Sequence, residues 1–522
     1  MGRKATSSGR IAKFRPLMAT LLIVAGALST NIVQPSLAYG LSPSAQFGSP
    51  IVVTPDSSGS GNAFKVSCPT ANLCITVGFD YATNSQEIYS VGTEAGGAWS
   101  WSTSAVIAPD SSGGGELNDL SCPSSTMCIA VGSDTKYLPI YTVGTEAGGS
   151  WSWSTSVVVT PDNSGGGSLL DVSCPSTTSC IAIGGDFASP EQEIYTVGTG
   201  AGGSWSWSTS SVITPDSSGG GLLDDLSCST TTSCVAVGDD VAGSPQSIFT
   251  AGTESGNTWT WTTSADVVPD SAGLGVLNGI DCASSTSCVA VGNDTGDTAY
   301  GQAIFAAGTE SGNTWTWTTS TDVAPDSSGG GSFNDVYCTS TTSCIAVGQN
   351  SAVTNQGMYS VGTESGNTWA WTTSADVSPD PSGEGELGGV TCPTASICVA
   401  VGIGGLGTSP NDGEIIAYSL LTATTLPTAK APGTVVIDFR LRSSTLNSAE
   451  HNALGRLATK LAAGDSVTIT GYAIDNGALA KRRAQDVAAY LLAKVKVHVT
   501  IKTVTKTAAN KVTVTTTKTL TA

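Results

Sequence analysis

The residues of this chain that could do chemistry are its carboxylates. Between Arg15 and Arg440 there is no arginine and no histidine, which excludes histidine-based acid/base catalysis and arginine capture of a carboxylate substrate in that region. Paired carboxylates remain the catalytic option. Acids stand shortly before the first cysteine of several repeats: Asp119, Asp171, Asp224, Asp225, Asp281 and Asp335. A catalytic pair should be singular, so we interpret these recurring acids as turn or packing residues.

The fourteen cysteines form seven pairs, with five residues inside each pair and 52 to 56 residues from one pair to the next. The pairs are Cys68/Cys74, Cys122/Cys128, Cys174/Cys180, Cys228/Cys234, Cys282/Cys288, Cys338/Cys344 and Cys392/Cys398. Thiolate binding of a metal is the alternative, but this spacing without a nearby histidine is a poor zinc pattern. The sequence therefore predicts seven structural disulfides, each closing a tight hairpin, and no metal site.

The cysteine pairs mark a repeat of strand type. One unit, residues 277–326, alternates apolar and polar residues between Gly, Ser, Asn and Pro-Asp turns, which predicts four antiparallel strands. Four-stranded units repeated radially are propeller blades, so we expect an all-β seven-bladed propeller over residues 39–421. The last unit lacks a fourth strand. Residues 45–54 align with that strand, with Phe47 where the second Trp of a Trp-x-Trp element would stand, so we expect the chain's beginning to close the ring.

Three further repeated features lie between or on the expected strands. The Trp-x-Trp elements, such as Trp259/Trp261, are interpreted as packing between blades, with sugar stacking as the alternative. The Pro-Asp-Ser-Ser-Gly-Gly stretches are interpreted as turns, with calcium binding by Asp oxygens as the alternative. The stretches 252–259 and 308–315 resemble the Asp-box of bacterial neuraminidase repeats, with Glu in place of Asp, and the resemblance implies only a structural turn.

Charge and the first 38 residues bear on location. Residues 39–430 hold 36 acids against three lysines, and residues 431–522 hold thirteen basic residues against five acids. The acidic repeat domain would repel nucleic acid, and the basic tail could meet a polyanionic surface. Basic residues before the apolar run 17–28, with 36–38 as a cleavage point, predict a signal peptide over 1–38; an uncleaved membrane anchor is the alternative. We expect a secreted protein, which agrees with paired cysteines.

After a Thr-, Ala- and Pro-rich linker at 422–433, residues 434–522 predict a small α+β domain. Its expected order is β-α-β-α-β-β: a strand at 435–439, a helix at 448–462, a strand at 466–470, a helix at 478–494, and two Thr-rich strands.

Motifs in this segment resemble the OmpA-like peptidoglycan-binding domain. They are Ile437-Asp-Phe439, Ser444-Thr-Leu446, Gly471-Tyr472, and the helical pattern from Asn476 to Leu491. The resemblance implies that Arg483, with an Asp after the central strand, holds the carboxylate of a peptidoglycan stem peptide. Asp475 comes one position later than the family's Asp, and Asn476 follows it. The alternative is that Arg483 forms a solvated ion pair and the domain shares only the fold.

Together these patterns predict a non-enzymatic, exported protein of the bacterial cell envelope or cell surface. The propeller would bind an unknown protein or glycan, and the OmpA-like domain would attach to peptidoglycan or another cell-wall polymer. Two alternatives stay open: an envelope enzyme that uses Asp and Glu in the propeller channel on glycans or peptides, and a secreted propeller lectin with solvent-facing Trp residues. No cofactor is expected, apart from the calcium alternative.

Overall fold

The computed structural model describes residues 46–421 except for short gaps, and parts of 434–516. The gaps are residues 49, 55–60, 81–84, 97, 164, 188–189, 216–218, 241–245, 257, 269–274, 295–300, 326–329, 352–355, 378–384, 396 and 405–413. Further on, it describes 434–438, 454, 466–472, 477–494, 498–504 and 511–516. The predicted signal peptide and linker lie outside the described residues. Among those described, no helix combines the length and apolar character needed to cross a membrane.

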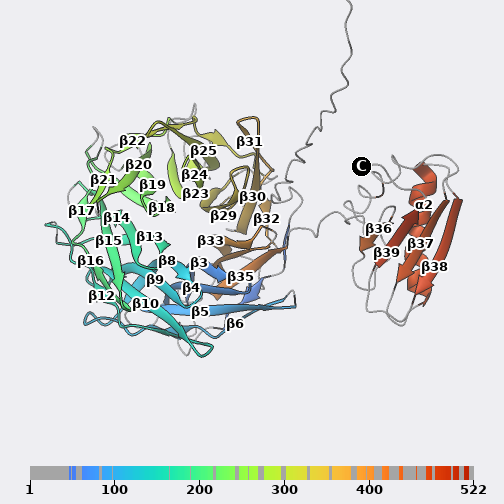
Figure 1. Ribbon diagram of the computed structural model, residues 1–522, viewed down its shortest axis with the longest axis horizontal. Coiled ribbons are helices and arrows are strands. Elements are labelled where there is room, and N and C mark those ends of the chain that lie inside the picture. Colours follow the sequence, from blue (N-terminus) through green and yellow to red (C-terminus); the bar gives the residue numbers. More distant parts are fainter. Residues whose placement is uncertain are drawn as a thin grey trace, which may run out of the picture. The chain divides into compact units, whose positions relative to one another are not determined.

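The first part is an all-β propeller whose sheets stand around a common axis (Figure 1). Six blades are continuous in sequence. Blade 1 is β3 (Asn62–Thr70), β4 (Leu73–Asp80), β5 (Gln86–Ala95), β6 (Ala98–Trp101) and β7 (Ala105–Val106). Blade 2 is β8 (Gly115–Ser124), β9 (Met127–Asp134), β10 (Pro139–Ala147), β11 (Ser150–Trp153) and β12 (Val157–Val158). Blade 3 is β13 (Ser168–Ser176), β14 (Ser179–Gly185), β15 (Glu193–Ala201), β16 (Ser204–Trp207) and β17 (Ser211–Val212).

The second half of the ring repeats this order. Blade 4 is β18 (Leu222–Thr230), β19 (Ser233–Asp240), β20 (Gln246–Ser255), β21 (Thr258–Trp261) and β22 (Ala265–Asp266). Blade 5 is β23 (Val276–Ser284), β24 (Ser287–Asp294), β25 (Gln302–Ser311), β26 (Thr314–Trp317) and β27 (Thr321–Asp322). Blade 6 is β28 (Ser332–Ser340), β29 (Ser343–Asn350), β30 (Gln356–Ser365), β31 (Thr368–Trp371) and β32 (Ala375–Asp376).

A further five-stranded sheet, the closing blade, joins the two ends of the propeller chain. It combines β33 (Gly385–Thr394), β34 (Ile397–Gly404) and β35 (Glu414–Leu421) with β1 (Gln46–Phe47) and β2 (Ile51–Val52). Phe47 pairs with Leu420, and Val52 pairs with Ile416. The beginning of the chain therefore supplies the outer edge of the last sheet, as the sequence predicted, and leaves no open blade in the ring.

The expectation of four strands per blade needs correction, because each described blade has five. The outer strand is broken into two pieces that pair with the same third strand: in blade 1, β6 and β7 both pair with β5. The break falls at Ser102–Ser104. The hydroxyl of Ser102 accepts a hydrogen bond from the Val91 amide, and the Ser104 amide donates to the Thr54 carbonyl of the closing blade. These local bonds replace ladder pairing, so the strand bends instead of continuing.

The seven predicted disulfides are all present, each within one blade. Each one joins the end of a blade's first strand to the start of its second. The bonds are Cys68–Cys74, Cys122–Cys128, Cys174–Cys180, Cys228–Cys234, Cys282–Cys288, Cys338–Cys344 and Cys392–Cys398. Every described cysteine is therefore bonded as the sequence predicted, and none is left as a thiol.

The second cysteine of each pair does more than close a hairpin. Cys74, Cys128, Cys180 and Cys398 have no exposed surface at all. Each of these four sulfur atoms belongs to an apolar cluster that two neighbouring blades share. They are therefore core residues as well as disulfide partners, and no ligand or solvent can reach them in the folded protein.

The propeller core is a series of layers between neighbouring blades. One cluster contains Val235 and Val237 of blade 4 with Leu277 and Ile304 of blade 5. The alternating apolar residues of the second strand supply one side of such a layer, and the first and third strands of the next blade supply the other. Each blade thus buries its faces only against its neighbours, as a repeat architecture requires.

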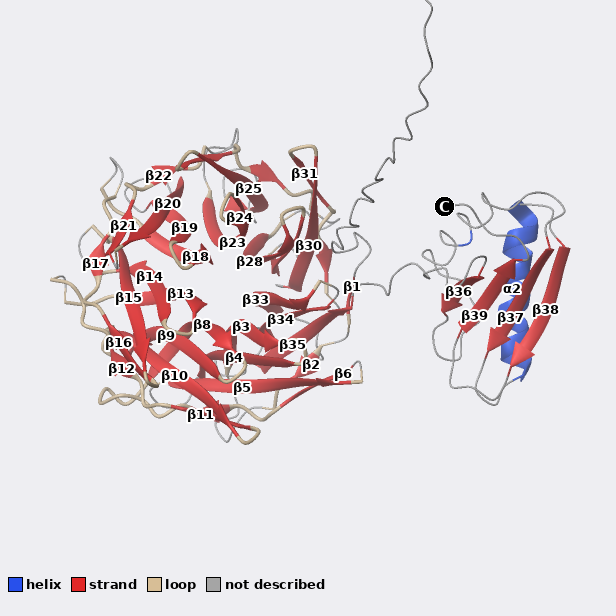
Figure 2. Cartoon of the chain, viewed as in Figure 1, coloured by secondary structure: helices blue, strands red, loops and turns tan. Residues whose placement is uncertain are grey.

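The described residues of 434–516 form a separate four-stranded sheet with one helix (Figure 2). The elements are β36 (Thr434–Asp438), β37 (Ser466–Tyr472), α2 (Gly477–Lys494), β38 (His498–Val504) and β39 (Lys511–Thr516). The sheet order is β36-β39-β37-β38, with β37 and β38 parallel. These bounds agree with the predicted strands and second helix. Of the first predicted helix only Leu454 is described, and it is helical and buried.

Candidate functional site at the propeller axis

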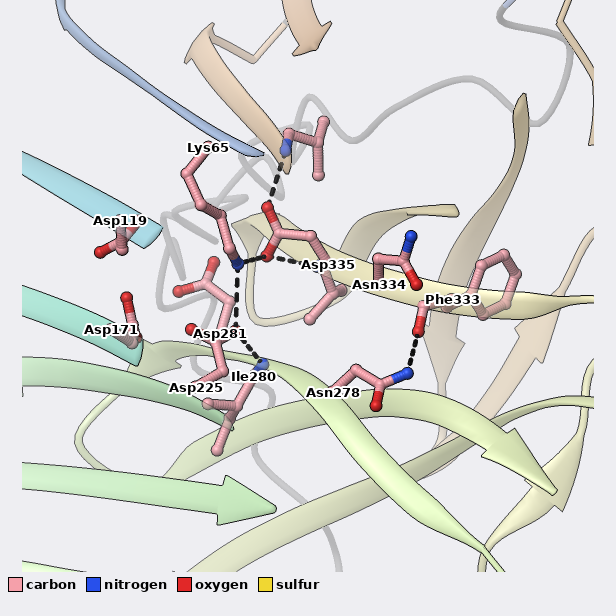
Figure 3. A network of polar contacts seen from close by, with 12 residues as sticks. Lys65, Asp119, Asp171, Asp225, Asn278, Ile280, Asp281, Phe333, Asn334 and Asp335 are labelled. Carbon is pink, nitrogen blue, oxygen red and sulfur yellow. Dashed lines mark hydrogen bonds and ion pairs between the residues drawn. The ribbon is translucent and has the colours of Figure 1, made fainter. Parts of the chain in front are cut away.

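The acids that precede the cysteines lie on the innermost strands, where they approach the propeller axis (Figures 1 and 3). Asp119, Asp171, Asp225 and Asp335 each stand three residues before the first cysteine of their blade. In blade 1 the same place is taken by Lys65. A β-bulge immediately precedes this place, as the register shift between Leu117 and Asp119 shows in blade 2. Such a bulge re-aims the side chain that follows it.

These four aspartates tie each blade to the next. Asp119 Oδ2 accepts a hydrogen bond from the Val172 amide at 2.9 Å, and Asp171 Oδ2 accepts from the Leu226 amide at 2.5 Å. The same bond recurs from the Ile280 amide to Asp225 Oδ2 and from the Val390 amide to Asp335 Oδ2, both at 2.7 Å. Each carboxylate therefore satisfies a backbone donor of the neighbouring innermost strand, which would otherwise be buried unpaired.

Asp281 holds a different position, one residue before Cys282. Four other blades have a serine there, and the remaining two have Tyr337 and Thr391. The Ser227 hydroxyl, for example, accepts a hydrogen bond from the Cys282 amide at 3.0 Å. Asp281 makes the equivalent bond, accepting from the Cys338 amide at 2.6 Å, and it also accepts from the Ser227 hydroxyl. It therefore belongs to a second layer of inter-blade ties.

Lys65 is the cation at the centre of the network (Figure 3). Its ammonium lies 3.1 Å from Asp335 Oδ1 and 3.8 Å from Asp225 Oδ2, so blade 1 reaches blades 6 and 4 across the axis. The side chain is only 16% exposed. Burial lowers the pKa of Lys65, but the carboxylates of Asp225, Asp335, Asp171 and Asp119 outweigh burial and raise the pKa well above its ordinary value.

The carboxyl groups around Lys65 hold protons more tightly than carboxyls in water. Burial raises the pKa of Asp335 to about 6, although Lys65 opposes that shift, and burial raises the pKa of Asp281 to about 7. The pKa values of Asp171 and Asp225 also lie well above the ordinary range, again mainly through burial. Asp171 makes side-chain hydrogen bonds to Asp119 and Asp225, and each carboxyl pair needs a shared proton.

This arrangement is a structural network. Each of the five aspartates accepts a hydrogen bond from a backbone amide of the next blade. A small depression lined by Asp281, Ser340 and Trp369 lies beside the network. Among the described residues, no group of three or more acidic, His or Cys side chains is placed to share a metal ion. The axial carboxylates therefore act as ties, as their repetition predicted.

The remaining predicted acid, Asp224, stands beside Asp225 and is half-buried. Burial and the nearby Asp239 and Asp225 carboxylates raise the pKa of Asp224 well above its ordinary value. The Pro-Asp segments behave as turns where they are described. Asp110 Oδ1 accepts from the Ser112 amide, and the Asp110 carbonyl accepts from the Gly113 amide.

The Trp-x-Trp elements pack between blades, which confirms the packing interpretation. In blades 2 to 6 the second indole of the pair meets an aromatic ring of the preceding blade; Trp207 lies 5.5 Å from Tyr141, and Trp317 lies 5.5 Å from Phe249. The indole also covers a glycine of its own blade: a Cβ on Gly198 would lie 2.8 Å from Trp207. In the closing blade Phe47 takes this role, with its ring 5.0 Å from Tyr359. All twelve Trp residues of these pairs are buried or half-buried, and none is fully exposed.

The predicted peptidoglycan residues fall in the C-terminal part. Arg483 lies on α2 and is fully buried, and burial lowers its pKa. The alternative, that Arg483 forms an ion pair and the domain shares only the fold, stays a prediction. Asp475 and Asn476 lie outside the described residues, so their distance from Arg483 stays a prediction.

Sequence reasoning missed Lys65 and the inter-blade bonds. The signal was present in the alignment of repeats, because the position three residues before the first cysteine holds either an acid or this one lysine in five of the seven units. In the other two units it holds Gly279 and Gly389. A Cβ on Gly389 would lie 2.8 Å from the Lys65 Cα, so glycine there allows close approach of neighbouring strands.

The sequence matches no protein-family model and no curated protein. Solved structures that resemble it include the BP39L lectin from Burkholderia pseudomallei, with a TM-score of 0.46, 10% identity, and 70% of this chain and 97% of that chain covered. An α-L-arabinofuranosidase from Fusarium graminearum has a TM-score of 0.37 and 9% identity, and the match covers 73% of this chain and 99% of that chain. A putative 6-phosphogluconolactonase from Bacteroides uniformis has a TM-score of 0.41 and 10% identity, and the match covers 66% of this chain and 96% of that chain. These likenesses concern the fold and assign no activity.

Proposed function

We propose that this chain is an exported protein of the bacterial cell envelope, in which the propeller is a binding module and the C-terminal domain attaches to peptidoglycan. The observation that favours a binding role over a catalytic one is the engagement of the axial aspartates. Asp119, Asp171, Asp225, Asp281 and Asp335 are each bonded to a backbone amide of the next blade. Carboxylates that maintain the ring are poor candidates for acid/base work, which requires a group free to exchange protons with substrate.

Export is supported by the seven disulfides, because such bonds persist in oxidising compartments. Attachment is supported by the resemblance of residues 434–522 to OmpA-like domains, in which Arg483 falls on the arginine that holds the stem-peptide carboxylate. A planar guanidinium suits bidentate capture of a carboxylate. In this proposal the stem-peptide carboxylate is held by Arg483 together with Asp475.

The attachment is tested by retention of the full-length protein on purified peptidoglycan. We expect Arg483→Ala and Asp475→Ala to lower retention at least tenfold, whereas Arg482→Ala, which removes the exposed neighbouring arginine, should leave retention unchanged. Because Arg483→Ala removes a buried group, Arg483→Lys and a thermal unfolding curve for each variant separate lost binding from lost folding. Retention that survives both Arg483→Ala and Asp475→Ala would rule out the site.

A further inference from the structure

The propeller presents an exposed pair of aromatic rings on the loops of two adjacent blades. Tyr137 follows β9 in blade 2 and is 66% exposed, and Phe187 follows β14 in blade 3 and is 52% exposed. The rings contact each other edge to face, with centroids 5.6 Å apart. We call these two side chains the aromatic platform. In the other ring contacts of the described propeller both side chains are buried or half-buried, so this pair differs from them in its exposure.

The platform is held in place by its backbone. Tyr137 has a φ of 60°, a left-handed conformation that is an outlier for a bulky residue. Asp134 enforces this conformation: its carboxylate accepts from the Lys136 and Leu138 amides, both at 2.8 Å, and its carbonyl accepts from the Tyr137 amide. The surrounding hydrogen bonds maintain a strained backbone at Tyr137 while its large ring points into solvent. Such a combination points to a functional surface.

Neighbouring segments fix the second ring and the spacing between the two. The Gly167 amide donates to the Tyr137 carbonyl at 3.0 Å, which joins the blade 2 loop to the connection between blades 2 and 3. Gly166 lies beneath the pair, since a Cβ there would be 3.3 Å from the Phe187 ring. At the base of the Phe187 loop, the Gln192 amide donates to Asp186 Oδ1 at 2.9 Å. The platform is therefore preorganised and loses little conformational freedom on binding.

The size of the platform limits what it can bind. Large aromatic side chains bury about 150–250 Å² each, so the exposed parts of two such rings offer roughly 250 Å². A stable protein interface takes about 800 Å² from each partner. A pyranose ring matches the smaller area, because one face of it is a patch of C–H groups that packs flat on an aromatic ring.

The charge around the platform limits its partner further. Residues 39–430 carry 36 acids against three lysines, and Asp162, Asp186 and Glu191 lie on the segments that adjoin the two rings. An anionic polymer would be repelled. Neutral sugars would not be repelled, and the Lys136 ammonium beside Tyr137 is exposed and can donate to sugar hydroxyls. The Thr135 hydroxyl donates to the Ser112 carbonyl and can still accept from a sugar.

We propose that Tyr137 and Phe187 form a binding site for a neutral polysaccharide, with one pyranose face packed on one ring and the edge of the sugar against the other ring, which stands at 79° to the first. This inference deepens the binding role proposed for the propeller and rests on it. A polymer of repeated sugar units suits a small site. Each protein molecule makes only one weak contact, but several protein molecules that bind along one polymer raise the overall avidity.

The test is affinity electrophoresis of the full-length, disulfide-bonded protein in native gels that contain laminarin, glycogen or galactomannan, with alginate as the anionic comparison. Phe187→Ala and Tyr137→Asn remove one ring each, and Asn tolerates the left-handed backbone of residue 137. Val268→Ala is the matched control, because Val268 is 59% exposed on blade 4, away from the platform. Near-ultraviolet circular dichroism checks that each variant keeps the wild-type fold.

We expect at least one neutral polymer to retard the wild type, each ring-removing variant to raise the dissociation constant tenfold or more, and Val268→Ala to leave it unchanged. The proposal would be overturned if none of the neutral polymers retarded the wild type, or if all variants were retarded equally. Stronger retardation by alginate than by the neutral polymers would also overturn it. Arg483→Ala keeps the platform, so loss of peptidoglycan retention with intact polysaccharide binding would implicate the attachment site alone.

Discussion

Lys65→Met should destabilise the propeller in a strongly pH-dependent way. The ammonium of Lys65 lies 3.1 Å from Asp335 Oδ1, which at an effective dielectric constant of about 20 corresponds to an attraction of about 5 kcal/mol. Much of this is offset by desolvation, and removing one partner of a buried pair typically costs about 3–5 kcal/mol because the remaining charge is left uncompensated. Met keeps the apolar stem, so the change removes mainly the charge.

The pH dependence follows from the carboxyl partner. The pKa of Asp335 is raised to about 6, so at pH 8 the carboxylate is charged in the folded state and needs the ammonium. At pH 4.5 Asp335 is mostly protonated, and Lys65 is then a buried cation with fewer charged partners. We therefore expect a loss of about 3–5 kcal/mol at pH 8 and less than about half of that at pH 4.5.

The assay is guanidinium unfolding of the disulfide-bonded protein, followed by tryptophan fluorescence at both pH values. Lys136→Met is the matched control, because Lys136 is the other lysine of the described propeller and is exposed; we expect a change within about 0.5 kcal/mol. An equal loss at pH 8 and pH 4.5, or no loss at pH 8, would refute the assignment of Lys65 as the counter-ion of the axial carboxylates.

Three further changes probe other parts of the ring. Burial raises the pKa of Glu87 to about 7. The stability that the protonated Glu87 carboxyl contributes is therefore present at pH 4 and is lost as the pH rises through 7. Glu87→Gln should flatten the fall in melting temperature between pH 5 and 8. Replacing both Cys228 and Cys234 by Ser should lower the free energy of unfolding, measured in urea titrations, by at least roughly 2–2.5 kcal/mol, the loop-closure value for seven residues. The loss exceeds that value to the extent that a serine hydroxyl is costly at the buried position 234. Phe47→Ala should cost about 3–5 kcal/mol by the same measurement, because the ring is buried against Tyr359; a loss below about 1 kcal/mol would mean that the closing contact contributes little.

Much of the propeller could be predicted because its sequence signals are local and repeated. The cysteine pairs fix a hairpin in each unit, and Phe47 could be placed in the closing blade because it occupies the position of the second Trp. The break in the outer strand could not be predicted in this way. It depends on bonds such as that from the Ser104 amide to the Thr54 carbonyl, which join two blades and leave no trace in strand periodicity.

The axial network was only partly predictable for a similar reason. The structural role of Asp119 or Asp335 could be inferred from repetition, but the identity of its donor could not, because the Val172 and Val390 amides belong to neighbouring blades. The platform formed by Tyr137 and Phe187 gave no signal at all. These residues lie 50 positions apart in loops of different length, and only the left-handed backbone at Tyr137 brings the rings together.

The pairing of Phe47 with Leu420 has a consequence for how the protein is made. These partners are 373 residues apart in the chain, whereas each disulfide joins cysteines six positions apart. As the chain enters an oxidising compartment, the early blades can therefore form and oxidise one by one, while β1 and β2 stay without their partner until β35 has emerged. The slowest contact to form is the one that completes the circle, and until then both ends offer unprotected strand edges to proteases and to other copies of the chain.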